Sequence, residues 1–187
     1  MMNTGACRAL PGTRAAPGIA EVVKPMSILR LALAGTLAFA AAAPATATAQ
    51  YRQVIANDAS ECAPGAGPAV RVAVSGIKAS TGMLRIQVYR GTEAEWLKKG
   101  AWLKRIEARA RAGSMSFCLP VPAAGTYAVA VRHDVNGNGK SDLSQDGGGM
   151  SNNPSINIFN LGKPSYKKTA FAVGSGVTAI RIDMKYM

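Results

Sequence analysis

The chain has 187 residues and a formal net charge of +12 at pH 7, because 22 Lys and Arg residues outnumber 10 Asp and Glu residues. Its one histidine, with Cys62 and Cys118, gives too few ligands for a convincing zinc site, because the third cysteine, Cys7, lies in the N-terminal extension. The chain also lacks a glycine-rich phosphate-binding motif, so the common nucleotide-binding sites are excluded as well.

A secretory signal peptide is predicted near the N-terminus. Arg30 precedes an apolar run at 31–43, and the small-residue sequence Ala-Thr-Ala gives a cleavage site after Ala49. The apolar run is shorter than the about 20 residues that a membrane-spanning helix needs. We therefore expect a periplasmic or secreted protein with no transmembrane span in its mature chain.

Three segments follow from this interpretation. Residues 1–49 are an N-terminal extension and signal peptide, with Met1 and Met26 as alternative start sites. Residues 50–68 are polar and rich in Ala, Gly and Pro, so they are predicted to be a flexible tether. Residues 69–187 are predicted to form the folded domain.

The mature chain from Gln50 has 18 Lys and Arg residues against 9 Asp and Glu residues, a net charge of +9. In an exported protein this charge favours an anionic envelope glycan or lipid as the partner rather than nucleic acid. A basic surface that is only solvated is the simpler alternative.

Cys62 and Cys118 are the only cysteines of the mature chain. Two such thiols most often join in an oxidising compartment, so a disulfide is predicted between them. The alternative is that Cys118 is simply a small buried residue.

From residue 69 onward, apolar and polar residues alternate, which is typical of strands with one face in a core. KTAFAV at 168–173 predicts a further strand. About seven strands without βαβ spacing predict an all-β fold: a single antiparallel β-sandwich, immunoglobulin-like or transthyretin-like. The inward-facing positions are expected to be Val70, Val72, Val74, Leu84, Ile86, Val88, Ile106, Ala108, Ala110, Met115, Phe117, Leu119, Tyr127, Val129, Val131, Ile180, Ile182, Met184 and Tyr186.

One short helix is predicted at 92–100, in TEAEWLKKG. Thr92 and Glu95 have capping-box spacing, and Gly100 ends the pattern. Trp96 and Leu97 are expected to fold back onto the sheet.

About thirty residues between His133 and Lys167 have no sustained periodicity, which predicts one long loop. Loops of this length are usually functional or disordered. The loop begins with oxygen-bearing residues at alternate positions, separated by glycines that permit a tight bend. This pattern predicts bound calcium as a cofactor. The ligands would be Asp134, Asn136, Asn138, the Lys140 carbonyl and Asp142.

A loop held by hydrogen bonds alone is the alternative, because Asn-Gly pairs form turns and Asp or Asn side chains accept hydrogen bonds from nearby N–H groups. Gln145 stands where an EF-hand has a bidentate glutamate, and Asp146 is the one further acidic residue of the loop. Calcium affinity is therefore expected to be modest, about 10⁻⁴ to 10⁻³ M.

His133 ends a predicted strand beside Asp134. A catalytic interpretation would pair them with a serine such as Ser151, although no nucleophile-elbow motif marks one. A packed or hydrogen-bonded histidine is the simpler interpretation. Asn152 and Asn153 either bond back to the loop through their amides or are ordinary turn residues.

Three stretches resemble one family in order and spacing. They are GTYAVAVRHDVNGNGKSD, GMSNNP and LGKPSYKKTAFAV, followed by a terminal strand that ends in Tyr186. The resemblance is to the bacterial exported family known as domain of unknown function 2141, and it extends from about Val70 to Met187. It implies an exported, all-β domain without an established activity. Members commonly have proline, glutamate and an aromatic residue before Ser-Asn-Asn, whereas this chain has LSQDGGGM, with Asp146 as the only acidic substitute.

We therefore expect a non-enzymatic binding or structural module of the cell envelope. One alternative is a hydrolase that uses His133 and Asp134. The other is a binder of anionic glycan or lipid that acts through Arg105, Arg109, Arg111 and Arg181.

Overall fold

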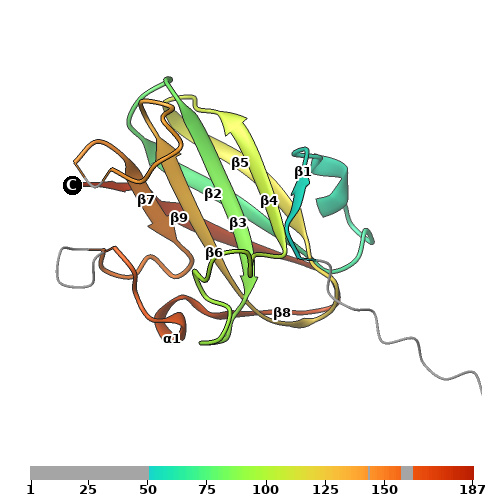
Figure 1. Cartoon of the computed structure of the whole chain (residues 1–187). Helices are drawn as coiled ribbons and strands as arrows, with labels where there is room; N and C mark the ends of the chain where they lie inside the picture. Colours follow the sequence, from blue (N-terminus) through green and yellow to red (C-terminus); the bar gives the residue numbers. More distant parts are fainter. Residues whose placement is uncertain (1–50, 143, 157–161) are drawn as a thin grey trace, which may run out of the picture. The chain divides into compact units, whose positions relative to one another are not determined.

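The computed structural model describes residues 51–142, 144–156 and 162–187, and the strands in Figure 1 form two β-sheets. Both sheets belong to the compact unit Pro44–Met187. The larger sheet has the order β1 (Gln53–Ile55), β4 (Lys104–Arg109), β3 (Met83–Arg90), β6 (Gly125–Asp134), β7 (Gly147–Met150) and β10 (Lys185–Tyr186), and β8 (Phe171–Val173) also pairs with β6. The smaller sheet has the order β5 (Gly113–Pro120), β2 (Ala69–Ile77) and β9 (Val177–Asp183).

The core lies between the two sheets and is formed by alternate residues of their strands. The inward-facing residues of β2 and β3, from Val70 to Val88, are all 0% exposed, as the alternation predicts. Ala108, Met115, Ile180 and Tyr186 are only partly buried and pack against the rest of this core. The all-β fold class is thus confirmed.

The prediction of a purely antiparallel sandwich is wrong, because each sheet contains one parallel pair. β1 runs parallel to β4, and β9 runs parallel to β2. β9 follows β8 of the larger sheet, so it enters the smaller sheet from the opposite layer rather than through a hairpin turn. Alternation shows which side chains face inward, but it does not show the direction of the neighbouring strand.

The segment predicted to be a flexible tether contains two ordered elements instead. β1 pairs with β4, and a 3-10 helix, η1 (Ala59–Cys62), begins where Asp58 accepts a hydrogen bond from the Ser60 N–H at 2.9 Å. Cys62 forms the predicted disulfide with Cys118 on β5, and their Cα atoms are 5.8 Å apart. The segment is ordered by these long-range contacts, which composition alone does not encode.

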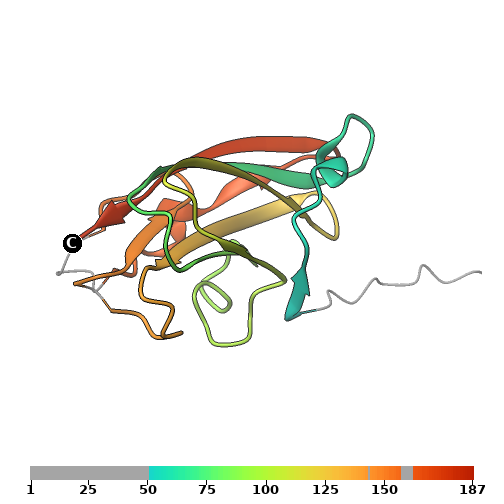
Figure 2. The ribbon, with the colours of Figure 1, turned by 90° about the horizontal axis from the view of Figure 1, so that it is seen from above.

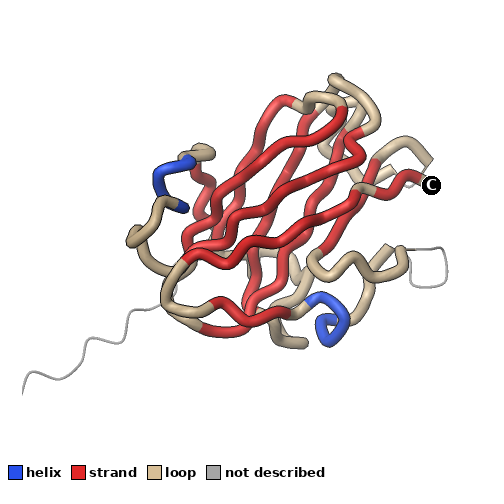
Figure 3. The backbone as a smooth tube through the Cα atoms, turned by 180° about the vertical axis from the view of Figure 1, so that it is seen from behind, coloured by secondary structure: helices blue, strands red, loops and turns tan. Residues whose placement is uncertain are grey.

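The helix predicted at 92–100 is absent, and this segment forms successive turns. Leu97 has a φ of 54° and Gly100 a φ of 80°, values at which a right-handed helix cannot continue. Besides η1, the described residues form one short α-helix, α1 (Tyr166–Thr169), visible in the tube of Figure 3. It takes up the first residues of the strand predicted at 168–173, which is reduced to β8.

A second, smaller apolar cluster lies on the outer face of the larger sheet. Tyr89, Trp96, Trp102, Ala128 and Met150 form it, with Leu97 packed against it, so the predicted fold-back of Trp96 and Leu97 is confirmed. Trp96 Nε1 donates a hydrogen bond to the Pro164 carbonyl at 2.8 Å. Figure 2 shows the turns that follow β3 on the opposite side of the larger sheet from β2 and β9.

β7 interrupts the segment predicted as one long loop. It pairs with β6 along one edge and with β10 along the other. A Cβ on Gly147 would overlap the Tyr186 ring, and a Cβ on Gly149 would lie 2.6 Å from Ile182 Cγ2, so both positions need glycine. Three consecutive glycines have no side-chain alternation, and sequence periodicity therefore could not reveal this strand. No helix among the described residues is long and apolar enough to cross a membrane.

Candidate functional site

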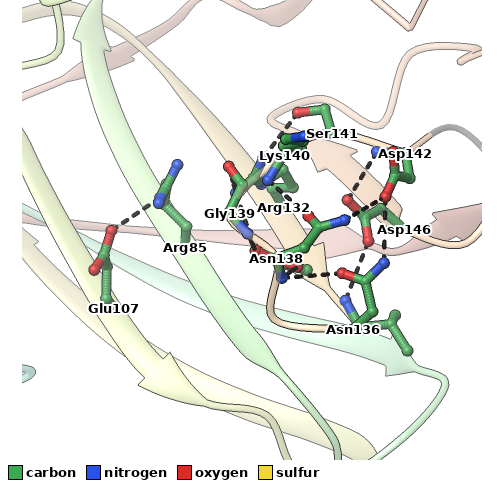
Figure 4. Close-up of polar contacts among 12 residues, drawn as sticks. Arg85, Glu107, Arg132, Asn136, Asn138, Gly139, Lys140, Ser141, Asp142 and Asp146 are labelled. Atoms are coloured by element: carbon green, nitrogen blue, oxygen red, sulfur yellow. Dashed lines mark hydrogen bonds and ion pairs between the residues drawn. The ribbon is translucent and has the colours of Figure 1, made fainter.

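The predicted loop begins at Asp134, at the end of β6, and turns back at once upon that carboxylate. Figure 4 shows Asn136 and Asn138 of this loop beside Asp142 and Asp146. Asp134 Oδ1 accepts a hydrogen bond from the Asn138 N–H at 3.1 Å, and Oδ2 accepts one from the Gly139 N–H at 2.8 Å. Asp134 is 5% exposed, so its charge is stabilised by these N–H donors rather than by solvent. The carboxylate fixes the start of the loop.

The two Asn-Gly pairs form the turns that their sequence predicts. Asn136 Oδ1 accepts a hydrogen bond from the Asn138 N–H at 3.0 Å, and Asn138 Oδ1 accepts one from the Lys140 N–H at 2.7 Å. Gly137 and Gly139 have φ values of 69° and 76°, in the left-handed region that glycine adopts without strain. The side chains of both asparagines therefore bond to backbone two residues further along.

Asp142 and Asp146 close the loop. The Asn138 and Asn136 side-chain amides donate to Asp142 Oδ2 at 2.7 and 3.2 Å, and these hydrogen bonds lower the pKa of Asp142 below its usual value. Asp146 accepts hydrogen bonds from the Val135 and Asp142 N–H groups at 3.2 and 3.0 Å. Asp146 therefore holds the two ends of the loop together, a role that its place in the sequence did not reveal.

Arg132 on β6 attaches the loop to the outer face of the larger sheet. Its guanidinium donates to Ser141 Oγ at 2.8 Å and to the Gly139 carbonyl at 3.2 Å, and it lies 3.4 Å from the Asp134 carboxylate. Arg132 Nε is buried without a hydrogen-bond partner among the described residues. Arg132 was missed as a site residue because strand alternation identifies it only as outward-facing.

Hydrogen bonds connect the side chains of this loop to its own backbone and to one another. The oxygens of Asp134 and Asp146 accept backbone N–H groups, and the Asn136 and Asn138 amides point toward Asp142. Within the described ranges, no group of three or more His, Cys, Asp or Glu side chains is arranged to hold a metal ion. Calcium binding stays a prediction.

His133 lies inside the fold and is 0% exposed. Its Nε2 lies 2.8 Å from the Thr81 carbonyl, and its Nδ1 lies 2.7 Å from the Tyr186 hydroxyl. Because a carbonyl only accepts, Nε2 carries the proton and Nδ1 accepts from Tyr186. Both ring nitrogens are thus occupied by the fold itself.

Ser151 and the two asparagines that follow it also bond to the fold rather than to His133 or the loop. Ser151 is 0% exposed, and its hydroxyl donates to the Thr169 carbonyl at 2.6 Å. Asn152 donates to the Ala170 carbonyl, and Asn153 both donates to the Arg181 carbonyl and accepts from the Asp183 N–H. Of the two alternatives for these asparagines, the turn interpretation agrees with their positive φ values of 63° and 47° and with these partners outside the loop.

The four arginines predicted as one anion-binding surface do not converge. Arg105 lies on β4 over the Trp102 ring at 4.1 Å, whereas Arg181 lies on β9 of the smaller sheet in an ion pair with Asp183. Arg109 and Arg111 are exposed at and just beyond the end of β4. The register of the larger sheet instead pairs Arg85 with Arg132.

Comparison with known proteins identifies a family. A family model described as an uncharacterized protein conserved in bacteria, domain of unknown function 2141, matches residues 72–181. No curated protein and no solved structure matches the chain. The matched range covers more than half of the chain, including the loop, His133 and β7, and it agrees with the resemblance in the sequence. The chain therefore belongs to the bacterial family of uncharacterized proteins known as domain of unknown function 2141.

Proposed function

We propose that this protein is an exported, non-enzymatic binding module of the cell envelope. The environment of His133 is the observation that carries this proposal. A general base must reach the proton that it abstracts, but both nitrogens of His133 are bonded inside the fold and the ring is fully buried. A hydrolase would use His133 and Asp134 for catalysis. Here His133 bonds to Tyr186 and Thr81, and Asp134 accepts backbone N–H groups of the loop.

The test is to replace His133 and to measure stability and hydrolytic activity together. His133→Ala is expected to lower the free energy of unfolding by about 2 to 4 kcal/mol, because it leaves a cavity and two unpaired polar groups. A loss of hydrolytic activity toward ester or glycoside substrates, with stability unchanged, would instead support the hydrolase alternative.

Export is the second part of the proposal. The signal-like segment that ends at Ala49 supports it, as does the disulfide, since disulfides persist mainly in oxidising compartments. Expression of the full chain in a bacterium, followed by fractionation and intact mass measurement, should recover a protein that begins at Gln50. Recovery of the uncleaved chain from the cytoplasm would contradict export.

Calcium binding to the loop is proposed as a further property of this module. Asp134, Asp142 and Asp146 all belong to one short loop, and the Asp146 carboxylate, which accepts a single hydrogen bond on each oxygen, keeps lone pairs for a cation. Calcium would require the Asn136 and Asn138 amides to turn their oxygens inward. Calcium at 5 mM should then raise the melting temperature relative to chelator, and Asp142→Ala should abolish the difference. Equal melting temperatures in calcium and in chelator would exclude the proposal.

A further inference from the structure

The outer face of the larger sheet, which faces away from the core, contains a cavity of about 300 Å³. One row of paired residues crosses its floor. Arg85 on β3 pairs with Arg132 on β6, Arg132 with Gly148 on β7, and Gly148 with Lys185 on β10. Directly paired residues of a sheet project from the same face. The register thus places three cationic residues around one glycine.

Gly148 leaves this floor open. A Cβ at Gly148 would meet no atom nearer than Ile156 Cδ1 at 4.0 Å, whereas its neighbours Gly147 and Gly149 face the tightly packed inner side. Gly148 has no positive φ that would demand glycine. Packing therefore does not require glycine here, and the missing side chain provides room inside the cavity.

The charges around the floor are only partly compensated. Like charges directly opposite each other destabilise a sheet, and Arg85 and Arg132 form such a pair. Glu107 lies 2.9 Å from Arg85, and Asp134 lies 3.4 Å from Arg132, so each arginine has one carboxylate partner. Buried Arg132 Nε has no partner within the described part of the chain, so one donor of this guanidinium is unsatisfied.

The lining combines charged side chains, mostly cationic, with apolar ones. Four cationic side chains face two carboxylates, and both carboxylates already accept hydrogen bonds in the loop. The charged residues are Arg85, Arg132, Lys163, Lys185, Asp142 and Asp146. The apolar part of the lining is formed by Leu97, Met150, Ile156 and Met187. A ligand that fits both parts has an anionic group joined to a short apolar body.

We propose that this cavity binds a small organic anion, a carboxylate or phosphate monoester with a short alkyl or aryl group. The anionic group lies between Arg85 and Arg132, whose planar guanidinium groups bind carboxylate and phosphate oxygens well. The apolar body lies against Met150 and Leu97. This inference gives the proposed binding module its ligand class, and it depends on neither export nor calcium.

The test is a titration followed by ¹H–¹⁵N NMR of protein purified after expression of the full chain. The probes are hexanoate and hexyl phosphate, with uncharged hexanol as the matched control. At least one of the two anions should bind saturably and shift the amide signals of Gly148 and Arg132. Hexanol should bind at least about tenfold more weakly, the difference expected from one charge-assisted interaction.

Variants identify the site. Gly148→Leu fills the floor and should abolish saturable binding, and Arg85→Gln should weaken it about tenfold. Arg181→Gln is the matched control, because Arg181 also lies 2.9 Å from its carboxylate partner but on the smaller sheet, and it should bind as the wild type does. Lys185→Gln, at an exposed position, should also weaken binding. It replaces Gly148→Leu as the test of the site if Gly148→Leu fails to fold.

Three results would overturn the proposal. They are no saturable binding of either anion, hexanol binding as tight as that of the anions, and equal weakening by Arg181→Gln and Arg85→Gln, which would indicate diffuse charge attraction. Any of these results would contradict the proposed ligand class. If the protein is nevertheless exported and cleaved, the export proposal would be unaffected.

Discussion

The hydroxyl of Tyr186, in the last strand, lies 2.7 Å from Nδ1 of His133, and the two rings meet edge to face across Gly147. The Lys78 N–H donates to the same hydroxyl at 3.0 Å. Tyr186 therefore accepts from Lys78 and donates to His133, whose Nε2 donates to Thr81. This chain of hydrogen bonds connects β10, β6 and the turn between β2 and β3.

Tyr186→Phe tests the importance of this relationship. The substitution keeps the ring but leaves His133 Nδ1 buried without a partner, which should lower the free energy of unfolding by about 1 to 3 kcal/mol. Urea unfolding measures the loss. Tyr51→Phe is the matched control, because the Tyr51 hydroxyl also forms a hydrogen bond, at 2.7 Å to Glu95, but on an exposed side chain. Equal losses of unfolding free energy in the two variants would show that the His133–Tyr186 hydrogen bond contributes no more to stability than an exposed one.

The same hydroxyl predicts a dependence of stability on alkaline pH. Burial raises the pKa of Tyr186 above its usual value, and the hydrogen bond from the Lys78 N–H lowers it less. Folding therefore favours the protonated phenol. Its contribution to stability is complete below the unfolded-state pKa of about 10 and is lost as pH rises through the higher folded-state pKa. Unfolding free energies measured from pH 8 to 11 should fall less steeply in Tyr186→Phe than in wild type, and equal slopes would contradict the assignment.

The glycines of β7 give a prediction with a built-in control. Gly147→Ala places a methyl group in the Tyr186 ring, and Gly149→Ala places one against Ile182, so each should cost about 1 to 3 kcal/mol through overpacking. Gly148→Ala faces open space and should be neutral or slightly stabilising. Thermal or urea unfolding of the three variants checks this order. Similar losses at all three positions would mean that β7 does not pack as described.

Asp134→Ala should destabilise the loop locally and the fold globally. It removes the acceptor of the Gly139 N–H, one of the two acceptors of the Asn138 N–H and one partner of Arg132, at a cost of about 2 kcal/mol. Amide hydrogen exchange at Asn138 and Gly139 should become faster. Asp58→Ala removes a similar acceptor at an exposed site and should cost less than Asp134→Ala does. Unchanged exchange at Asn138 would show that other contacts hold the loop.

The disulfide closes a sequence separation of 56 residues. Loss of this crosslink in the double variant Cys62→Ala and Cys118→Ala should reduce the free energy of unfolding by about 4 kcal/mol in the chain-entropy model. Peptide mass mapping without reduction checks the linkage itself. Recovery of both cysteines as free thiols from the exported protein would contradict it.

Much of the fold was predictable because its strands alternate. Val70, Val72 and Val74 indicate their shared face through side-chain type alone. β7 was not predictable, since glycines have no such pattern, and the helix at 92–100 was a false prediction. Its capping spacing also suits a turn, and Leu97 adopts a left-handed φ that no local pattern indicates.

The candidate site also contains some contacts that the sequence predicts and others that it does not. The turns of Asn136 and Asn138 form from residues two positions apart, so the sequence predicts them. Tyr186 lies 53 residues from its partner His133, and Arg85 meets Arg132 only through strand register. Such contacts depend on the topology of the sheet, which the alternation of side chains does not contain.

The central claim is that His133 is a structural residue of a binding module rather than a catalytic base. The protein contains a single histidine, so a long-range ¹H–¹⁵N NMR spectrum of the imidazole reports on this residue alone. At pH 7 we predict a proton on Nε2, slow exchange of that proton with solvent, and an Nδ1 signal typical of a hydrogen-bond acceptor. A proton on Nδ1, or an Nε2 proton that exchanges rapidly with water, would contradict the claim.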